Sequence, residues 1–260
     1  MKTPVRTLSP EEARFIRSRV IFDDEAFVAF DKPSGLSSQG GRIAAATLDD
    51  LLAAFVKPSG ARPKLAHRLD RGTSGVILAA KTKPAAGFIG RALMAGRVKK
   101  TYLAILAPPP AHDHGTIDAA LAREEIGREA FVRVVAADHP EARSARTSWR
   151  VRVRRKEAAL VELSPATGRM HQLRVHTAGI GSPIAGDARY GGALVLAGKP
   201  VSRVMLHALA LVIPHPAGGT RRIVAPLPDD FEDLATALGI ASPACPRLGE
   251  AARNSEGARS

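Results

Sequence analysis

The residue types best suited to chemistry gather in one short segment, His67–Gly75, which reads HRLDRGTSG. Its only carboxylate, Asp70, is flanked by the guanidinium groups of Arg68 and Arg71. Nearby positive charge stabilises an ionised carboxylate, and a carboxylate held in that form can act as a nucleophile. The glycines of the segment allow a tight turn, and the hydroxyl group of Thr73 can donate a hydrogen bond to a bound anion.

Two other interpretations of this segment compete with a catalytic one. Asp70 could be a salt-bridged residue that stabilises a turn, and the segment by itself favours this interpretation, because ion-pair networks also perturb carboxylates. A protein kinase is excluded in spite of the kinase-like His-Arg-Asp order. Leu69 interrupts that order, and the sequence contains neither a glycine-rich phosphate loop nor Asp-Phe-Gly.

A second segment with chemical potential is Thr167–His176, which reads TGRMHQLRVH. If it is helical, His171 and Arg174 share one face, and Gln172 and His176 share another. The two histidines are five residues apart with no acid between them, which does not match the spacing of a helical zinc site. The segment therefore predicts a cluster of polar and basic side chains without a metal.

The charge of the chain favours a polyanionic partner. The 38 Lys and Arg residues outnumber the 25 Asp and Glu residues, which gives a formal net charge of +13. Such an excess is typical of nucleic-acid binding, and a general basic bias of composition is the alternative. With 4% aromatic residues, including one Trp and two Tyr, the chain has too few stacking platforms for a protein built to bind single strands.

One predicted strand carries a row of arginines. In Thr147–Arg154 apolar residues alternate with arginines, which predicts a strand with one apolar and one cationic face. The cationic face consists of Arg150, Arg152 and Arg154, and the surrounding residues 141–156 include seven basic residues and one acidic residue. This arginine strip could contact phosphates of an RNA backbone, or it could be an ordinary solvated face.

Strands and helices interleave without a regular βαβ rhythm, which favours an α+β fold with a mixed sheet. We expect strands at Val76–Ala80, Val98–Leu106, Thr147–Arg154 and Val201–Pro214, and helices at Leu48–Phe55, Pro84–Ala95, Thr167–Ala178 and Phe231–Leu238. The expected organisation is a basic N-terminal extension over 1–19, a single catalytic domain over 20–240 and a flexible tail over 241–260.

Several classes of protein are excluded by simple counts. The single cysteine, Cys245, excludes a disulfide framework and a multi-cysteine metal site, and it fits a reducing compartment. No apolar run is long enough to span a bilayer, and the N-terminal residues lack the apolar core of a signal peptide. We therefore expect a cytoplasmic protein that is not attached to a membrane.

Taken together, the motifs resemble the RluA-type pseudouridine synthases. In chain order they are Lys32–Leu36, His67–Gly75, Lys100–Ala104, Thr167–His176, Gly181–Asp187 with Tyr190 and Gly191, and Leu206–Ala208 with His215 and Pro216. The sequence His-Arg-Leu-Asp-x-x-Thr-Ser-Gly is highly specific, so the resemblance overrides the interpretation of Asp70 as a turn-stabilising residue. It implies the pseudouridine synthase fold, which is a largely antiparallel central sheet with flanking helices and a central catalytic cleft.

The resemblance also implies roles for three catalytic residues. Asp70 corresponds to the catalytic aspartate of the family. Tyr102 corresponds to the active-site tyrosine that packs on the uracil and can help to remove the C5 proton. Arg174 corresponds to the basic residue that pairs with the aspartate.

The substrate-binding residues implied by the resemblance are Arg68, Thr73, Arg169, His171 and Leu206. Arg68 resembles the arginine that fills the gap left by the flipped-out nucleotide. Leu206 resembles the apolar residue that packs near the base, and Arg169 is a second candidate for the basic partner of the aspartate.

The chemistry of pseudouridine formation fits this residue set. The reaction detaches uracil from C1′, turns it and rejoins it through C5, so it needs no redox agent, no energy source and no cofactor. It needs a carboxylate, a proton shuttle and a closed pocket. The base must first be flipped out of its stack, at a cost of a few kcal/mol that phosphate contacts offset. Whether the aspartate attacks the sugar, attacks the ring or stabilises a cation is left open.

One departure from the family pattern bears on the substrate. Many relatives carry an N-terminal S4 RNA-binding domain, and residues 1–19 leave no room for one. We therefore expect a stand-alone catalytic domain, with RNA affinity supplied by the domain itself, including the arginine strip. The expected function is the isomerisation of specific uridines in structured ribosomal or transfer RNA by a monomer without an obligatory protein partner. A catalytically silent RNA-binding or chaperone protein and a nucleoside-cleaving hydrolase are the alternatives.

Overall fold

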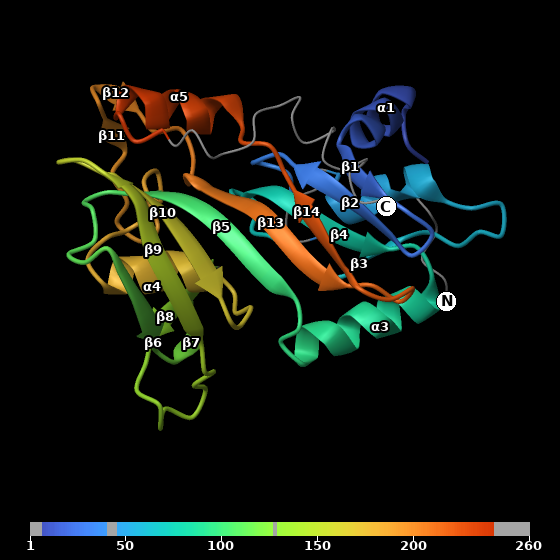
Figure 1. Ribbon diagram of the computed structural model, residues 1–260, viewed down its shortest axis with the longest axis horizontal. Helices are drawn as coiled ribbons and strands as arrows, with labels where there is room; N and C mark the ends of the chain where they lie inside the picture. Colours follow the sequence, from blue (N-terminus) through green and yellow to red (C-terminus); the bar gives the residue numbers. More distant parts are fainter. Residues whose placement is uncertain (1–6, 41–45, 127–128, 242–260) are drawn as a thin grey trace. The chain divides into compact units, whose positions relative to one another are not determined.

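The computed structural model describes residues 7–40, 46–126 and 129–241, and they form two compact units (Figure 1). Of the described residues, unit 1 contains 7–98 and 208–226, and unit 2 contains 99–207 and 227–241. Each unit combines helices with antiparallel strands, which confirms the predicted α+β class. In the described part of the chain, no helix has the length and apolar character needed to cross a membrane.

The sheet of unit 1 is built around a fully buried strand. Its strands are β1 (Val20–Asp23), β2 (Phe27–Lys32), β3 (Lys64–Leu65), β4 (Ser74–Ala80), most of β13 (Leu206–Pro214) and β14 (Thr220–Val224). They follow the order β1-β2-β4-β13, with β14 paired to β13 and β3 paired to β4. All seven residues of β4 are buried, as expected for the continuous apolar run in the sequence.

The helices of unit 1 begin where local capping signals stand. Helix α1 (Pro10–Ser18) is capped by Ser9, and α2 (Leu48–Leu51) by Thr47. In each case the acidic residue three positions on accepts a reciprocal hydrogen bond from the amide of the capping residue. A short 3-10 helix, η1 (Leu52–Phe55), continues α2, and α3 (Lys83–Met94) follows β4. The predicted helices Leu48–Phe55 and Pro84–Ala95 are thus found, whereas α1 forms within the segment expected to be a basic extension.

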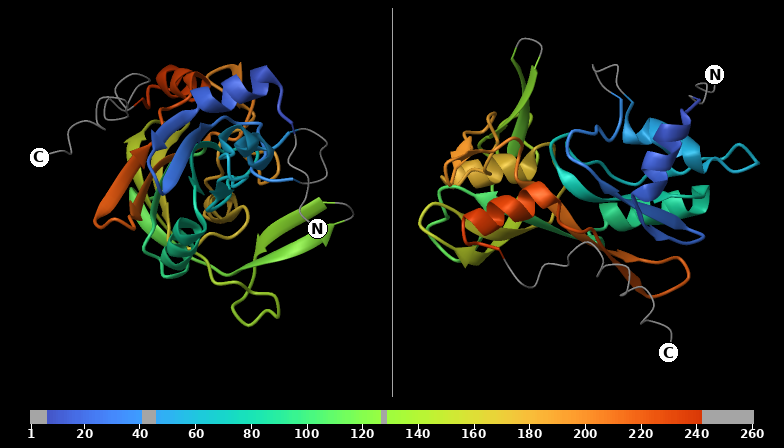
Figure 2. Two further views of the ribbon diagram at one scale, coloured as in Figure 1. Left: turned by 90° about the vertical axis from the view of Figure 1, so that its right-hand side faces the viewer. Right: turned by 90° about the horizontal axis from the view of Figure 1, so that it is seen from above.

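Unit 2 contains an antiparallel sheet in the order β5-β10-β9-β6 (Figure 1). Its elements are β5 (Lys99–Leu106), β6 (His114–Asp118), β7 (Leu121–Ile126), β8 (Glu129–Val134), β9 (Arg146–Arg154), β10 (Ala159–Pro165), α4 (Gln172–Gly179), β11 (Val195–Leu196), β12 (Lys199–Pro200) and α5 (Asp229–Ala237). Strands β7 and β8 form a separate hairpin, which projects from the rest of unit 2 in Figure 2.

The helix predicted from Thr167 was placed too early, because α4 begins at Gln172. The side chain of Gln172 folds the preceding residues into a turn. Its Oε1 atom accepts hydrogen bonds from the Thr167 hydroxyl group at 2.7 Å and from the Arg169 amide at 3.0 Å. These bonds replace the helical pattern over 167–171, and His171 takes a left-handed conformation with φ of 52°.

Two other elements also differ from expectation. The predicted strand Val201–Pro214 begins at Leu206, and the residues of 111–140, which carry no clear apolar pattern, form β6, β7 and β8. The predicted tail over 241–260 lies outside the described residues, except for its first residue.

Candidate active site

The backbone on the N-terminal side of Asp70 is fixed by a single buried hydroxyl group. The Oγ atom of Ser38 donates to the carbonyl oxygen of Leu69 at 2.7 Å and accepts from the amide of Leu69 at 3.0 Å. Ser38 is 4% exposed, so water does not compete effectively for these bonds. Both polar backbone groups of the residue before Asp70 are therefore held in place.

The backbone on the C-terminal side of Asp70 is held by a buried lysine. The ammonium group of Lys32 donates to the carbonyl oxygens of Pro33 at 3.0 Å, Leu36 at 2.8 Å and Arg71 at 3.3 Å. Lys32 is completely buried, and a buried cation is stable only where such acceptors surround it. The lysine thereby joins the Lys32–Leu36 motif to the residue after Asp70.

Three further hydrogen bonds join the same two motifs. The amide of Gly35 donates to the carbonyl oxygen of Arg71 at 2.8 Å, and the Arg71 Nε atom donates back to the Gly35 carbonyl at 2.9 Å. The hydroxyl group of Ser34 donates to the carbonyl oxygen of Gly72 at 2.9 Å. Sequence reasoning assigned no role to the Lys32–Leu36 motif, and the structure shows that it supports the Asp70 loop.

The Asp70 loop then turns into β4 with little freedom. The amide of Thr73 donates to the carbonyl oxygen of Asp70 at 3.1 Å, and Thr73 is only 2% exposed. Gly75 has a φ of 108°, and a Cβ atom there would lie 2.2 Å from the carbonyl oxygen of Ala208. Only glycine fits this close approach. Asp70 itself is partly exposed and Arg68 is exposed, whereas Thr73 supports the turn from inside.

His67 has a structural role in this arrangement. Its Nε2 atom accepts a hydrogen bond from the amide of Leu78 at 3.2 Å, which ties the start of the motif to the middle of β4. An imidazole nitrogen that accepts a hydrogen bond carries no proton. The histidine of the motif therefore fixes the loop rather than supplying a proton through this nitrogen.

Tyr102 lies on one defined face of the sheet of unit 2. In β5 it stands opposite Leu163 of β10, which in turn stands opposite Trp149 of β9. Directly opposite residues of antiparallel strands project to the same face of a sheet. Tyr102, Leu163 and Trp149 therefore share one face, which we call the tyrosine face.

Helix α4 is anchored to the tyrosine face. Thr147 lies on this face because it is two residues from Trp149. Its hydroxyl group accepts from Gln172 Nε2 at 3.0 Å and is hydrogen-bonded to His176 Nδ1 at 2.9 Å. The predicted pairing of Gln172 and His176 on one side of the helix is thus confirmed. Because α4 covers this face, Tyr102 and the α4 residues belong to the same side of unit 2.

Arg174 is oriented by a carboxylate that sequence reasoning did not assign. Its Nε and Nη2 atoms donate to the two oxygens of Asp187, each at 2.7 Å. Asp187 is 1% exposed, and the guanidinium carbon of Arg174 lies 5.0 Å from the centroid of the Tyr190 ring. Both contacts come from the Gly181–Asp187 motif and the tyrosine that follows it. In the sequence, this motif is evident only as part of the resemblance. Its place in the order of motifs is the only sequence signal that Asp187 has a role at the site.

Tyr190 connects this ion pair to the β7–β8 hairpin. Its hydroxyl group is hydrogen-bonded to His171 Nδ1 at 2.8 Å and accepts from the amide of Val132 in β8 at 3.2 Å. Burial raises the pKa of Tyr190, so its hydroxyl group keeps its proton at neutral pH. His171, a predicted substrate-binding residue, is therefore held beside Arg174 through Tyr190.

Two other predicted substrate-binding residues are also placed in unit 2. The Nε atom of Arg169 donates to the carbonyl oxygen of Ser144 at 3.1 Å, so its guanidinium group is engaged by the neighbouring loop. Leu206 is 3% exposed and begins β13. Of the two candidates for the basic partner of the aspartate, Arg174 is the one with a buried, bidentate anchor.

The arginines of the strip do not all share one face of the sheet. Arg150 stands opposite Glu162, which stands opposite Leu103, the residue after Tyr102. Because successive residues of a strand point to opposite faces, Arg150 and Tyr102 lie on opposite sides of the sheet. A register shift between Leu160 and Val161 reverses the alternation, so Arg154 stands opposite Ala159 and, beyond it, Leu106, on the same side as Tyr102. The predicted single cationic face is therefore wrong. The placement of Arg150 disfavours a contact of this arginine with RNA next to the tyrosine.

The other two arginines of the strip are paired within the protein. Arg152 forms an ion pair with Glu162, and Arg154 forms an ion pair of 2.8 Å with Asp113. These bonds reduce the charge that the strip can offer to phosphates. Contact between these arginines and RNA phosphates remains a prediction.

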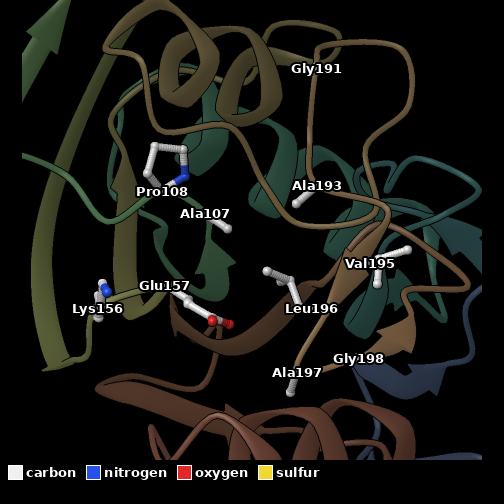
Figure 3. A pocket seen from close by; sticks show the side chains of 10 residues that line it. All are labelled: Ala107, Pro108, Lys156, Glu157, Gly191, Ala193, Val195, Leu196, Ala197 and Gly198. Atoms are coloured by element: carbon white, nitrogen blue, oxygen red, sulfur yellow. The ribbon is translucent and has the colours of Figure 1, made fainter.

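A groove of about 600 Å³ lies elsewhere in unit 2 (Figure 3). Lys156 and Glu157 stand on one side of it, and small and apolar residues of 195–198 stand opposite. No predicted site residue lines this groove.

Comparison with known proteins identifies the class of the chain. A model of the RNA pseudouridylate synthase family matches residues 26–179, which include Asp70, Tyr102 and Arg174. The chain belongs to this family, as the motifs implied. It is 37% identical to an uncharacterized RNA pseudouridine synthase of Zymomonas mobilis over 220 residues, which are 84% of this chain and 98% of that protein.

Relatives with more specific names and solved structures agree with this class. The chain is 36% identical to ribosomal large subunit pseudouridine synthase C of Escherichia coli O157:H7 over 221 residues, which are 82% of this chain and 67% of that protein. The structure of human RNA pseudouridylate synthase domain containing 4 matches with a TM-score of 0.75 and 26% identity, over 89% of this chain and 97% of that chain. Human RNA pseudouridylate synthase domain containing 1 matches with a TM-score of 0.65 and 28% identity, over 84% and 86%.

Proposed function

We propose that the chain isomerises uridines of structured RNA to pseudouridine, with Asp70 as the catalytic carboxylate. The observation that carries this proposal is the support of the Asp70 loop. Ser38 fixes Leu69 on one side, and Lys32 and Gly35 fix Arg71 on the other. A catalytic group needs a backbone held to within a fraction of an ångström, whereas a surface ion pair does not. The match to the synthase family supplies the reaction.

The reaction balances without a cofactor. The bond between C1′ and N1 breaks, a bond between C1′ and C5 forms, C5 loses a proton and N1 gains one. No oxidant, reductant or phosphoryl donor takes part. The carboxylate of Asp70 assists the exchange at the sugar or the ring, and a proton-transfer group moves the C5 proton.

The remaining roles follow the family pattern. Arg174, whose Nε and Nη2 atoms are held by Asp187, is the proposed basic partner of the catalytic carboxylate. Tyr102 packs on the uracil and assists removal of the C5 proton. The exposed Arg68 fills the gap left by the flipped nucleotide.

Ribosomal RNA is the substrate class we propose. Relatives of more than one species are named ribosomal large subunit pseudouridine synthase C, and the net charge of +13 suits a large folded RNA. Transfer RNA is the second candidate from the same chemistry. We further propose that the protein works in the cytoplasm as a monomer.

The test measures the release of tritium from RNA transcripts labelled at C5 of uridine. Wild-type protein and the variants Asp70→Asn, Asp70→Ala and Asp233→Asn are incubated with ribosomal and transfer RNA. Asp233 is an exposed carboxylate in α5 and serves as the matched control. We expect tritium release by wild type and Asp233→Asn, and none by either Asp70 variant.

The alternatives give different products. A hydrolase would release free uracil and leave abasic sites, and a silent RNA-binding protein would bind RNA without tritium release. Undiminished tritium release by both Asp70 variants would refute the role of this residue.

A further inference from the structure

Lys100 is a partly buried cation on the same side of unit 2 as Tyr102. The two residues are two positions apart in β5, and alternate residues of a strand point to the same face. Lys100 therefore belongs to the tyrosine face, whereas the exposed Lys99 points to the opposite face. Sequence reasoning noted Lys100 only as the first residue of a motif and gave it no role.

The ammonium group of Lys100 lies against the loop that leads into α4. A Cβ atom added at Gly168 would lie 3.3 Å from the Nζ atom of Lys100. Gly168 belongs to the turn that Gln172 folds back on itself, and Gln172 is anchored to Thr147 on the tyrosine face. The charge thus sits against the turn that precedes α4, the helix that carries Arg174.

The positive charge of Lys100 has no partner among the described residues. Among residues 7–40, 46–126 and 129–241, none forms a hydrogen bond or ion pair with the Lys100 ammonium group, and burial lowers the pKa of this group. The other buried cations are satisfied, since Arg174 is paired with Asp187 and Lys32 has its carbonyl oxygens. A half-buried ammonium group without an acceptor is costly unless a ligand supplies one.

We propose that Lys100 binds a backbone phosphate of the RNA next to the uridine that is modified. A phosphate oxygen is the acceptor that an unpaired ammonium group lacks, and Lys binds phosphate as a compact point charge. Because Gly168 has no Cβ atom, the ammonium group of Lys100 can lie close to the backbone of the turn. The inference rests on the proposed function, since it takes RNA as the ligand.

The test compares two neighbouring lysines on opposite faces of one strand. Binding of a ribosomal RNA fragment is measured at several salt concentrations for Lys100→Met and Lys99→Met, both in the inactive Asp70→Asn background. Each phosphate contact contributes about 0.7–0.9 to the slope of log K against log salt concentration. We expect the slope to fall by about this amount for Lys100→Met and to stay unchanged for Lys99→Met.

Two more variants separate charge from shape. Lys100→Arg keeps the charge and should keep most of the slope. Gly168→Ala crowds the ammonium group and should weaken binding less than Lys100→Met does. Thermal unfolding confirms that each variant is folded before binding is measured.

An equal slope for the Asp70→Asn protein with and without Lys100→Met, or an equal loss of slope for Lys99→Met, overturns the proposal. Binding is measured without turnover, so this result is independent of the isomerase activity. Failure of the proposed function would appear instead as absent tritium release by wild-type protein.

Discussion

Arg174 and Asp187 form a bidentate ion pair in which Nε and Nη2 of the arginine donate to the two carboxylate oxygens, each at 2.7 Å. The side chains are 11% and 1% exposed, so the pair is shielded from solvent. A bidentate pair fixes the plane of the guanidinium group as well as its position. Asp187 thereby acts as a positioning residue, which sets the orientation of the Arg174 guanidinium group.

The variant Asp187→Asn should lose activity through this loss of orientation. The amide cannot accept at both positions, and a misplacement of about 1 Å can cost about 10²-fold in rate. We also expect the free energy of unfolding to fall by about 3–5 kcal/mol, because a buried guanidinium group is left unpaired. Single-turnover rates at saturating RNA and urea unfolding measure the two effects separately.

The matched control is Asp118→Asn, which breaks an exposed ion pair with Arg146. That pair has a separation of 3.4 Å and side chains that are 65% and 61% exposed. Such pairs contribute about 0–1 kcal/mol, so this variant should resemble wild type. A folded Asp187→Asn protein with a wild-type single-turnover rate would contradict the positioning role.

The variant Ser38→Ala tests the support of the Asp70 loop. It removes the hydroxyl group that donates to and accepts from Leu69, and it leaves two buried backbone groups without that partner. We expect a loss of about 1–3 kcal/mol in the free energy of unfolding and a fall in kcat that exceeds the change in KM. The exposed Ser202 provides the control, since Ser202→Ala removes a hydroxyl group outside this loop. An unchanged kcat for Ser38→Ala would show that the geometry of the Asp70 loop does not depend on the hydrogen bonds between Ser38 and Leu69.

Local signals predicted the elements that depend on local contacts. Thr47 caps α2 through Asp50, three residues away, and the apolar run of β4 needs no distant partner to be recognised. The start of α4 could not be predicted in this way, because Gln172 is anchored to Thr147, 25 positions earlier. The turn before α4 therefore depends on a contact that only the folded sheet provides.

The residues of the candidate site show the same difference between local signals and distant contacts. Asp70, Tyr102 and Arg174 could be proposed from the sequence because their motifs are specific, whereas the residues that support them depend on tertiary contacts. Ser38 lies 31 positions from Leu69, and Asp187 lies 13 positions from Arg174. Nothing in residue type or periodicity indicates that these pairs meet. The bulge that places Arg150 and Arg154 on opposite faces of the sheet likewise appears only in the strand register.

The arginine strip gives a prediction that separates its two interpretations. We expect Arg150→Ala to change RNA affinity less than Lys100→Met does, because Arg150 lies on the face opposite Tyr102. The doubly changed protein Arg152→Ala, Arg154→Ala also breaks the pairs with Glu162 and Asp113, so its stability is measured first. A fall in the salt slope of about one for each arginine removed would restore the phosphate-contact interpretation.

The pH dependence of stability should carry a contribution from His176. Burial lowers the pKa of this imidazole below its ordinary value of 6.5, and its ring is hydrogen-bonded to Thr147 and Ala119. The unfolded chain then binds a proton at a higher pH than the folded protein does. The free energy of unfolding is therefore highest above pH 6.5 and falls as the pH drops through 6.5 towards the folded pKa. Urea unfolding at a series of pH values between 7.5 and about 5 measures this slope, and His176→Gln should flatten it. His114→Gln, which changes an exposed histidine of β6, should leave the slope as in wild type, and an equal flattening by both variants would exclude burial of His176 as the cause.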